Sequence, residues 1–162
     1  MHSIVFSVLL LLLLASSCSK QDYAPDPHQA LSVIPATDPE MAAAIANARA
    51  SLPQFWQVFE HPQHGETNFA VKVRFSDTND TEYVWLGRIE RKDGSLFGSV
   101  GGGHLTVSCV KPGDRVTIDD TEIGDWSYEQ GGKMFGNYTV RALFKVMSSK
   151  DVDYFKRTLA AP

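Results

Sequence analysis

The chain has 162 residues, a formal net charge of −4 and 21% charged residues. No basic stripe of the kind that nucleic-acid binding needs is visible, so we expect no nucleic-acid partner. The slightly acidic balance also argues against a polybasic surface that docks on anionic lipid.

The first 17 residues have the architecture of a bacterial signal peptide. A largely apolar run extends from Ile4 to Leu14, and the small residues Ala15, Ser16 and Ser17 follow it. The run is shorter than the roughly twenty apolar residues that a membrane-spanning helix needs, and small residues behind such a run are typical of a cleavage site. We therefore expect residues 1–17 to be removed.

Cys18 comes directly after this site, where lipoprotein processing attaches diacylglycerol. The sequence thus predicts a lipoprotein with palmitate and a membrane anchor on Cys18; a plain secreted protein with a chance cysteine is the alternative. Ser19 follows the cysteine, which in Gram-negative bacteria resembles the signal for the outer membrane. We expect the protein at the periplasmic face of that membrane. Lipidation of Cys18 would leave Cys109 without an intramolecular partner, so no internal disulfide is expected.

A proline-rich tether over residues 18–36 is predicted to lead into a single globular domain over residues 37–162. Thr37 or Asp38 can cap a first helix, because Pro39 suits a first helical turn and an alanine-rich segment follows. A second short helix is expected over residues 52–59.

Alternating apolar residues then predict antiparallel strands joined by turns. The strand over residues 82–90 has bulky side chains on both faces and should be central. Asp93-Gly94 is a strong hairpin signal. The Gly101–Gly103 run is predicted to be a turn rather than a phosphate loop, because a strand-like segment and not a helix follows it. The expected strands, which form a meander, are 69–75, 82–90, 95–100, 104–110, 115–118 and a final pair at 125–128 and 134–135.

The last segments favour helices. Residues 140–147 fit both an alternating and a helical period, and we prefer the helix. Residues 151–159 predict another helix, with Ser148 or Ser149 as its cap. The expected fold class is α+β, a mainly antiparallel sheet with helices at the N- and C-terminal ends.

The sequence contains four spaced blocks, Glu82–Gly98, Pro112–Val116, Ile123–Tyr128 and Gly136–Arg141. Together they resemble the YegJ-like bacterial domain of unknown function, and the resemblance covers about residues 38–147. The family offers no activity that could be transferred to this chain. Domains of this kind look like domains that are encoded near bacterial toxin and immunity genes. The resemblance therefore implies a binding role.

The best candidate for a binding patch lies around the last hairpin. An arginine with an acidic residue and neighbouring tyrosines can grip a carboxylate or an amide-rich ligand. The structural alternative is an ion pair between Asp125 and Arg141, with the aromatic residues in the core. The candidate residues are Asp125, Trp126, Tyr128, Tyr138, Thr139 and Arg141.

No catalytic residues, metal site or cofactor are predicted. His61 and His64 lack a third ligand and a rigid element, so an exposed polar turn is the better interpretation. His104 and Cys109 would project to opposite faces of a strand, and Cys109 is better explained as a small buried residue.

The favoured function is a non-enzymatic binding protein of the periplasm, with a protein partner in the envelope and, in one form, immunity against a secreted bacterial toxin. The alternative is a hydrolase that acts on cell-wall or lipid material. The sequence offers no pair of nucleophile and base, which favours binding.

Overall fold

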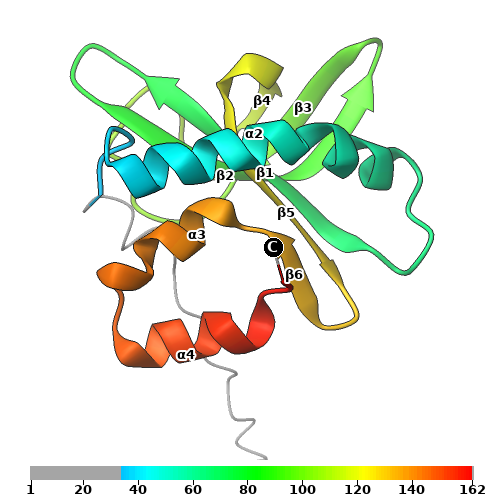
Figure 1. Cartoon of the computed structure of the whole chain (residues 1–162). Helices are drawn as coiled ribbons and strands as arrows, with labels where there is room; N and C mark the ends of the chain where they lie inside the picture. Colours follow the sequence, from blue (N-terminus) through cyan, green and yellow to red (C-terminus); the bar gives the residue numbers. More distant parts are fainter. Residues whose placement is uncertain (1–33, 162) are drawn as a thin grey trace, which may run out of the picture.

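The computed structural model describes residues 34–161, which form a six-stranded antiparallel sheet with helices at its N- and C-terminal ends (Figure 1). The predicted α+β class is confirmed. The predicted signal peptide, Cys18 and nearly all of the tether lie outside the described residues. The elements are α2 (Pro39–Glu60), β1 (Thr67–Ser76), β2 (Thr81–Lys92), β3 (Ser95–Val100), β4 (Arg115–Ile118), η1 (Asp120–Glu122), β5 (Ile123–Gln130), β6 (Lys133–Gly136), α3 (Tyr138–Ala142), η2 (Leu143–Lys145) and α4 (Ser149–Thr158).

The first helix begins as the sequence predicts. The Asp38 carboxylate accepts hydrogen bonds from the backbone N–H groups of Glu40 and Met41, at 3.0 and 3.2 Å, and Pro39 occupies the first turn. The prediction of a separate second helix is wrong, because α2 continues through Pro53 to Glu60. Proline removes one backbone donor from a helix. Here burial of Ala48 and Phe55 on the same helix, at 1% and 0% exposure, holds the two halves together.

The order of the strands in the sheet is β4-β3-β2-β1-β5-β6. Strands β1 to β4 form a meander as predicted, but β5 pairs with β1 and not with its predecessor β4, so the prediction of one continuous meander is wrong at β5. Residues Ile123 to Trp126 of β5 are all buried, and this stretch therefore requires cover on both sides. The short β4, with Arg115 and Thr117 exposed, instead forms an edge of the sheet. The predicted central position of the strand at residues 82–90 is confirmed.

Two tight turns join neighbouring strands, and the turn at Asp93-Gly94 lies where the sequence predicts it. Asp93 and Gly94 have φ angles of 50° and 78°, as a two-residue hairpin turn requires, and Gly131 and Gly132 have 56° and 76° between β5 and β6.

The segment between β3 and β4 contains no strand, so the strand predicted over residues 104–110 is wrong. Its backbone N–H groups donate to side-chain carboxylates instead of to a neighbouring strand: Thr106 N to Glu82, at 2.8 Å, and Ser108 N to Asp77, at 2.6 Å. Val107 and Val110 turn inward, whereas Cys109 is exposed, contrary to the expected burial.

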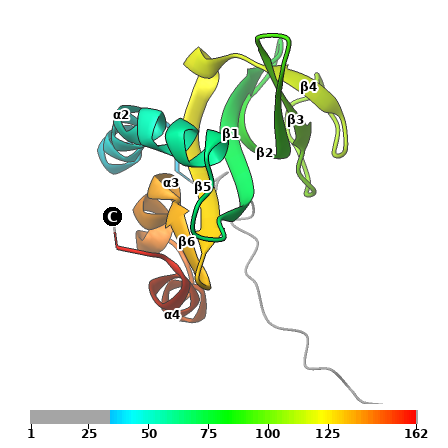
Figure 2. The same ribbon diagram turned by 90° about the vertical axis from the view of Figure 1, so that its right-hand side faces the viewer.

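The helical interpretation of residues 140–147 is confirmed by α3 and η2. The final helix α4 begins after Ser148, whose hydroxyl accepts from the Asp151 backbone N–H. Figures 1 and 2 show α2 and α3 on the same side of the sheet and α4 next to β6. No helix within residues 34–161 is long and apolar enough to cross a membrane.

The core lies between α2 and the sheet. Phe55 of α2 is fully buried, and its ring centroid lies 5.3 Å from that of Trp126 and 6.0 Å from that of Phe69. Tyr128 extends the same aromatic stack from Trp126 towards Phe135 on β6. These contacts fix β1 and β5 beneath α2, and the two strands carry Lys72 and Asp125.

Candidate functional site

A lysine lies inside the protein at the middle of β1. Lys72 is 1% exposed, although the alternating pattern of this strand places it on the side away from Val71 and Val73, where polar residues point to solvent. Its register partners are Trp85 on β2 and Asp125 on β5. Burial of a lysine carries a large free-energy cost unless the charge is compensated.

Asp125 supplies that compensation from the neighbouring strand. Its side chain is completely buried and accepts four hydrogen bonds, from the backbone N–H groups of Trp126, Tyr138 and Thr139 and from the Thr139 hydroxyl, at 2.7 to 3.2 Å. Asn137, the residue before α3, makes no side-chain cap, so the Asp125 carboxylate satisfies the first N–H groups of this helix. Burial raises the pKa of Asp125, while Lys72 and the Thr139 hydroxyl oppose that rise.

Thr139 joins the two charges. Lys72 Nζ donates to Thr139 Oγ1 at 3.0 Å, and Thr139 Oγ1 donates to Asp125 Oδ2 at 2.7 Å. We call these three residues the buried polar cluster. Burial lowers the pKa of Lys72 to about 8, and the charge of Asp125 limits the decrease. In the cluster the Thr139 hydroxyl thus lies between the ammonium of Lys72 and its counter-ion, the carboxylate of Asp125.

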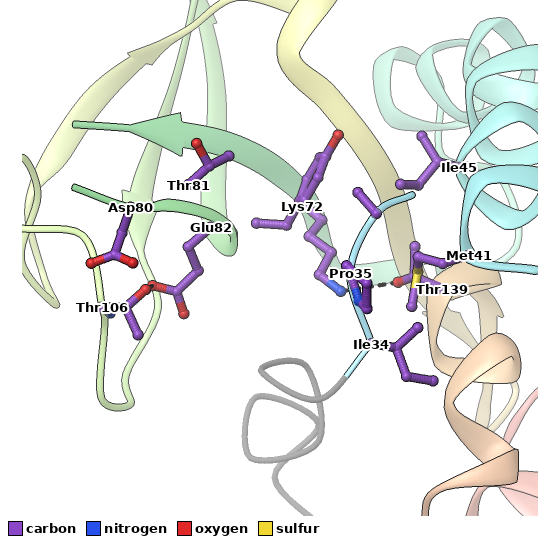
Figure 3. A pocket seen from close by; sticks show the side chains of 12 residues that line it. Ile34, Pro35, Met41, Ile45, Lys72, Asp80, Thr81, Glu82, Thr106 and Thr139 are labelled. Atoms are coloured by element: carbon purple, nitrogen blue, oxygen red, sulfur yellow. Dashed lines mark hydrogen bonds between the residues drawn. The ribbon is translucent and has the colours of Figure 1, made fainter. Parts of the chain in front are cut away.

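The buried polar cluster borders a cavity of about 320 Å³. This volume is at the lower end of the range for small-molecule sites. Figure 3 shows Lys72 between two unlike ends of the cavity, with apolar residues and Thr139 on one side and acidic and hydroxyl residues on the other. The lining residues are Ile34, Pro35, Ala36, Met41, Ile45, Lys72, Asp80, Thr81, Glu82, Tyr83, Thr106 and Thr139.

The structure separates the six residues predicted as a binding patch. Asp125 and Thr139 meet in the buried polar cluster, and Thr139 also lines the cavity. Trp126, Tyr128 and Tyr138 belong to or pack against the core, and Trp126 Nε1 donates to the Ala48 carbonyl at 3.1 Å.

Arg141 contributes elsewhere. Its guanidinium donates to the Ala160 carbonyl at 2.8 Å, and its buried Nε has no hydrogen-bond partner among the described residues. The ion pair considered between Arg141 and Asp125 is not the one that forms, because Lys72 reaches Asp125 through Thr139. A binding role for the six residues stays a prediction.

The structure places His61, His64, His104 and Cys109 in exposed turns. The His64 backbone N–H donates to Glu66, at 2.7 Å, which ties the turn between α2 and β1. Cys109 and His104 are both exposed in the segment between β3 and β4. In the part of the chain that the structure describes, no group of three or more His, Cys, Asp or Glu side chains could hold a metal ion.

Sequence reasoning missed Lys72, the residue on which the site depends. The alternating pattern of β1 is typical of a strand in a sheet with one solvent-exposed face. It therefore predicts that the Lys72 side chain is solvated. Two features of the sequence could have indicated a buried lysine. Lys72 stands between two valines in a strand that lies inside the sheet, and Asp125 stands in another strand whose neighbouring residues are buried.

The lowered pKa of Lys72 predicts how the free energy of unfolding depends on pH. Between pH 8 and 10.5 the unfolded chain keeps the lysine proton while the folded protein loses it. Stability rises with pH wherever the unfolded state binds more protons. We therefore expect the wild type to gain stability relative to Lys72→Met over this window, by up to about 1.4 kcal/mol per pH unit. Urea unfolding of both proteins at several pH values measures this gain. A difference in the free energy of unfolding that stays constant between pH 8 and 10.5 would contradict titration of Lys72 in this range.

Comparison with known proteins gives a family and a relative. The model of a family described as "Uncharacterized protein conserved in bacteria (DUF2314)" matches residues 38–160. The chain is 29% identical over 119 residues to "Uncharacterized protein YegJ" of Escherichia coli strain K12, covering 74% of this chain and 76% of that protein. The resemblance seen in the spaced sequence blocks is thereby confirmed. No solved structure matches the chain.

Proposed function

The chain belongs to the DUF2314 family of bacterial proteins, and from that premise we propose that it is a lipid-anchored protein of the bacterial envelope that binds a partner and catalyses no reaction. One observation carries the binding role: the buried ammonium of Lys72 borders a cavity of about 320 Å³. A charged donor in the wall of a partly apolar cavity can act as a recognition group, because its hydrogen bonds are directed.

The hydrogen bonds of the buried polar cluster favour binding over hydrolysis. A hydrolase of this type needs a hydroxyl beside a base that takes its proton. The Thr139 hydroxyl accepts from Lys72 and donates to Asp125, and Asp125 already accepts from three backbone N–H groups. The hydroxyl is therefore fixed in a structural hydrogen bond, and the envelope hydrolase is the weaker alternative.

The partner that we propose is a protein of the envelope. The family resemblance implies a more specific role, in which the chain confers immunity by binding a secreted toxin. Pulldown from envelope extracts with the full-length protein tests it. We expect a captured partner to be lost with Lys72→Met and kept with Asp153→Asn, a change at an exposed site on α4. A secreted effector gene next to the gene for this chain would support the immunity role, whereas a partner that binds both variants equally would contradict the cavity as its site.

The anchor is tested at Cys18. We expect Cys18→Ala to leave an unlipidated precursor, because the thiol that would carry diacylglycerol is missing. The wild type should incorporate radiolabelled palmitate and fractionate with the membrane, and the variant should do neither. Cys109→Ser serves as the matched control, since Cys109 is exposed in the folded domain. Equal palmitate in the wild type and Cys18→Ala would rule out this anchor.

A further inference from the structure

The cavity presents three kinds of chemistry in a fixed arrangement. A cation lies between an acidic end and an apolar end, as Figure 3 shows. A ligand that satisfies all three must combine an anionic group, a hydrogen-bond donor or cation, and an aliphatic part. The contacts of each region define this ligand further.

The cationic region is the ammonium of Lys72. It carries three N–H donors. One donates to Thr139 Oγ1 at 3.0 Å, and the described part of the chain offers no second hydrogen-bond acceptor to it. Its other close neighbour is the ring of Trp85, whose centroid lies 5.5 Å from Nζ. Asp125 does not line the cavity, and its carboxylate accepts from the Thr139 hydroxyl. Lys72 can therefore donate to an oxygen anion that enters the cavity.

The acidic region comprises Asp80, which directly precedes β2, and Glu82, the second residue of that strand. Glu82 Oε2 accepts from the N–H and hydroxyl groups of Thr106, at 2.8 and 3.0 Å, which fixes its carboxylate against the segment between β3 and β4. Asp80 is exposed, and its carboxylate has no hydrogen-bond partner among the described residues. Two carboxylates at this end repel a ligand with a second negative charge and attract an ammonium or a peptide N–H.

The apolar region lies at the opposite end. Ile34 and Met41 are buried, at 8% and 3% exposure, and Ile45 of α2 is partly buried beside them. These three side chains offer hydrocarbon surface without a polar atom other than the Met41 sulfur. An aliphatic side chain gains roughly 25 cal/mol for each Å² of apolar surface that it buries there.

We propose that the cavity binds the free α-carboxylate of an aliphatic amino-acid residue, with the carboxylate on Lys72, the side chain between Ile34, Met41 and Ile45, and the nitrogen towards Asp80 and Glu82. This inference rests on the proposed binding function and names its ligand. The carboxylate belongs either to a free amino acid or to the carboxyl terminus of a partner polypeptide, which share this chemistry.

Calorimetric titration of the full-length protein in detergent, with matched probes, tests the proposal. The probes are L-leucine, a tripeptide that ends in leucine, leucinamide and 4-methylpentanoate. Leucinamide lacks the carboxylate, and 4-methylpentanoate lacks the nitrogen. We expect either leucine or the tripeptide to bind, which identifies the source, and each truncated probe to bind at least roughly tenfold more weakly, because each leaves a charged group in the site unpaired.

Variants assign the contacts. We expect Lys72→Met to weaken binding of the better probe by roughly tenfold to a hundredfold and Asp80→Asn to weaken it by a smaller factor, while Asp153→Asn leaves it unchanged. Asp80 is exposed, so its variant tests the site even if Lys72→Met fails to fold.

Two results would overturn the proposal: leucinamide that binds as tightly as leucine, or no binding of either leucine or the tripeptide. Envelope pulldown separates this failure from failure of the proposed function. A partner that still depends on Lys72 while neither probe binds refutes the ligand class alone, and a protein that captures no Lys72-dependent partner and binds no probe refutes both.

Discussion

Asp125→Asn is expected to lower the free energy of unfolding by about 3–5 kcal/mol, because it leaves the buried ammonium of Lys72 without its counter-ion. The amide also replaces one carboxylate oxygen with a donor, which opposes the N–H groups of α3 that Asp125 accepts from. Urea unfolding followed by circular dichroism measures the loss. Hydrogen exchange at the Tyr138 and Thr139 amides should accelerate in the same variant.

A double-mutant cycle isolates the pair. Lys72→Met removes the charge and keeps an unbranched apolar side chain in its place. If Asp125 and Lys72 compensate each other, the double variant should be more stable than the sum of the two single losses indicates. Asp153→Asn, on the exposed side of α4, is the control and should change stability by less than about 0.5 kcal/mol. A loss below about 1 kcal/mol for Asp125→Asn would be that of an exposed ion pair and would contradict the buried polar cluster.

Phe55→Ala is expected to cost about 3–5 kcal/mol through the cavity that it creates in the core. Phe55 is fully buried and lies against the rings of Trp56, Phe69 and Trp126. Its loss should loosen α2 from the sheet, and α2 also carries Met41 and Ile45 to the cavity. Thermal unfolding and near-UV circular dichroism of the aromatic stack would report both effects.

Phe59→Ala is the matched control for this core substitution. Phe59 stands one helical turn later on α2, makes ring contacts with Phe55 and Phe69, and is only partly buried. We expect a clearly smaller loss of stability, since part of its ring surface is already in water. Equal losses for the two variants would show that the core centres on the whole end of α2 and not on Phe55.

These predictions connect the core with the proposed binding site. If Phe55→Ala displaces α2, the apolar end of the cavity opens although no lining residue has changed, so affinity for a leucine-type probe should fall along with stability. Asp125→Asn should act differently, because it removes the counter-ion that supports the Lys72 charge and changes none of the residues that line the cavity. Measuring affinity beside stability in both variants separates the shape of the cavity from its charge.

The sequence alone determined the parts of the protein that depend on neighbours along the chain. Asp38 and Pro39 start α2 through hydrogen bonds and a φ angle within one turn, Asp93-Gly94 sets its hairpin through positive φ angles, and the spacing of apolar residues in 140–147 predicts the helix found there. Each of these signals acts over a few residues. The α+β class follows from their order, and the spaced sequence blocks identify the family.

Only the tertiary structure decided where those elements meet. Pairing of β5 with β1 brings Asp125 beside Lys72, and α3 then delivers Thr139 between them from a position 67 residues along the chain from Lys72. No local pattern encodes this, because a lysine in an alternating strand has the same sequence signature whether its side chain faces water or a buried aspartate. The charge of Lys72 can be buried only because three segments that are distant in the sequence converge on it. The same convergence forms the cavity beside Lys72.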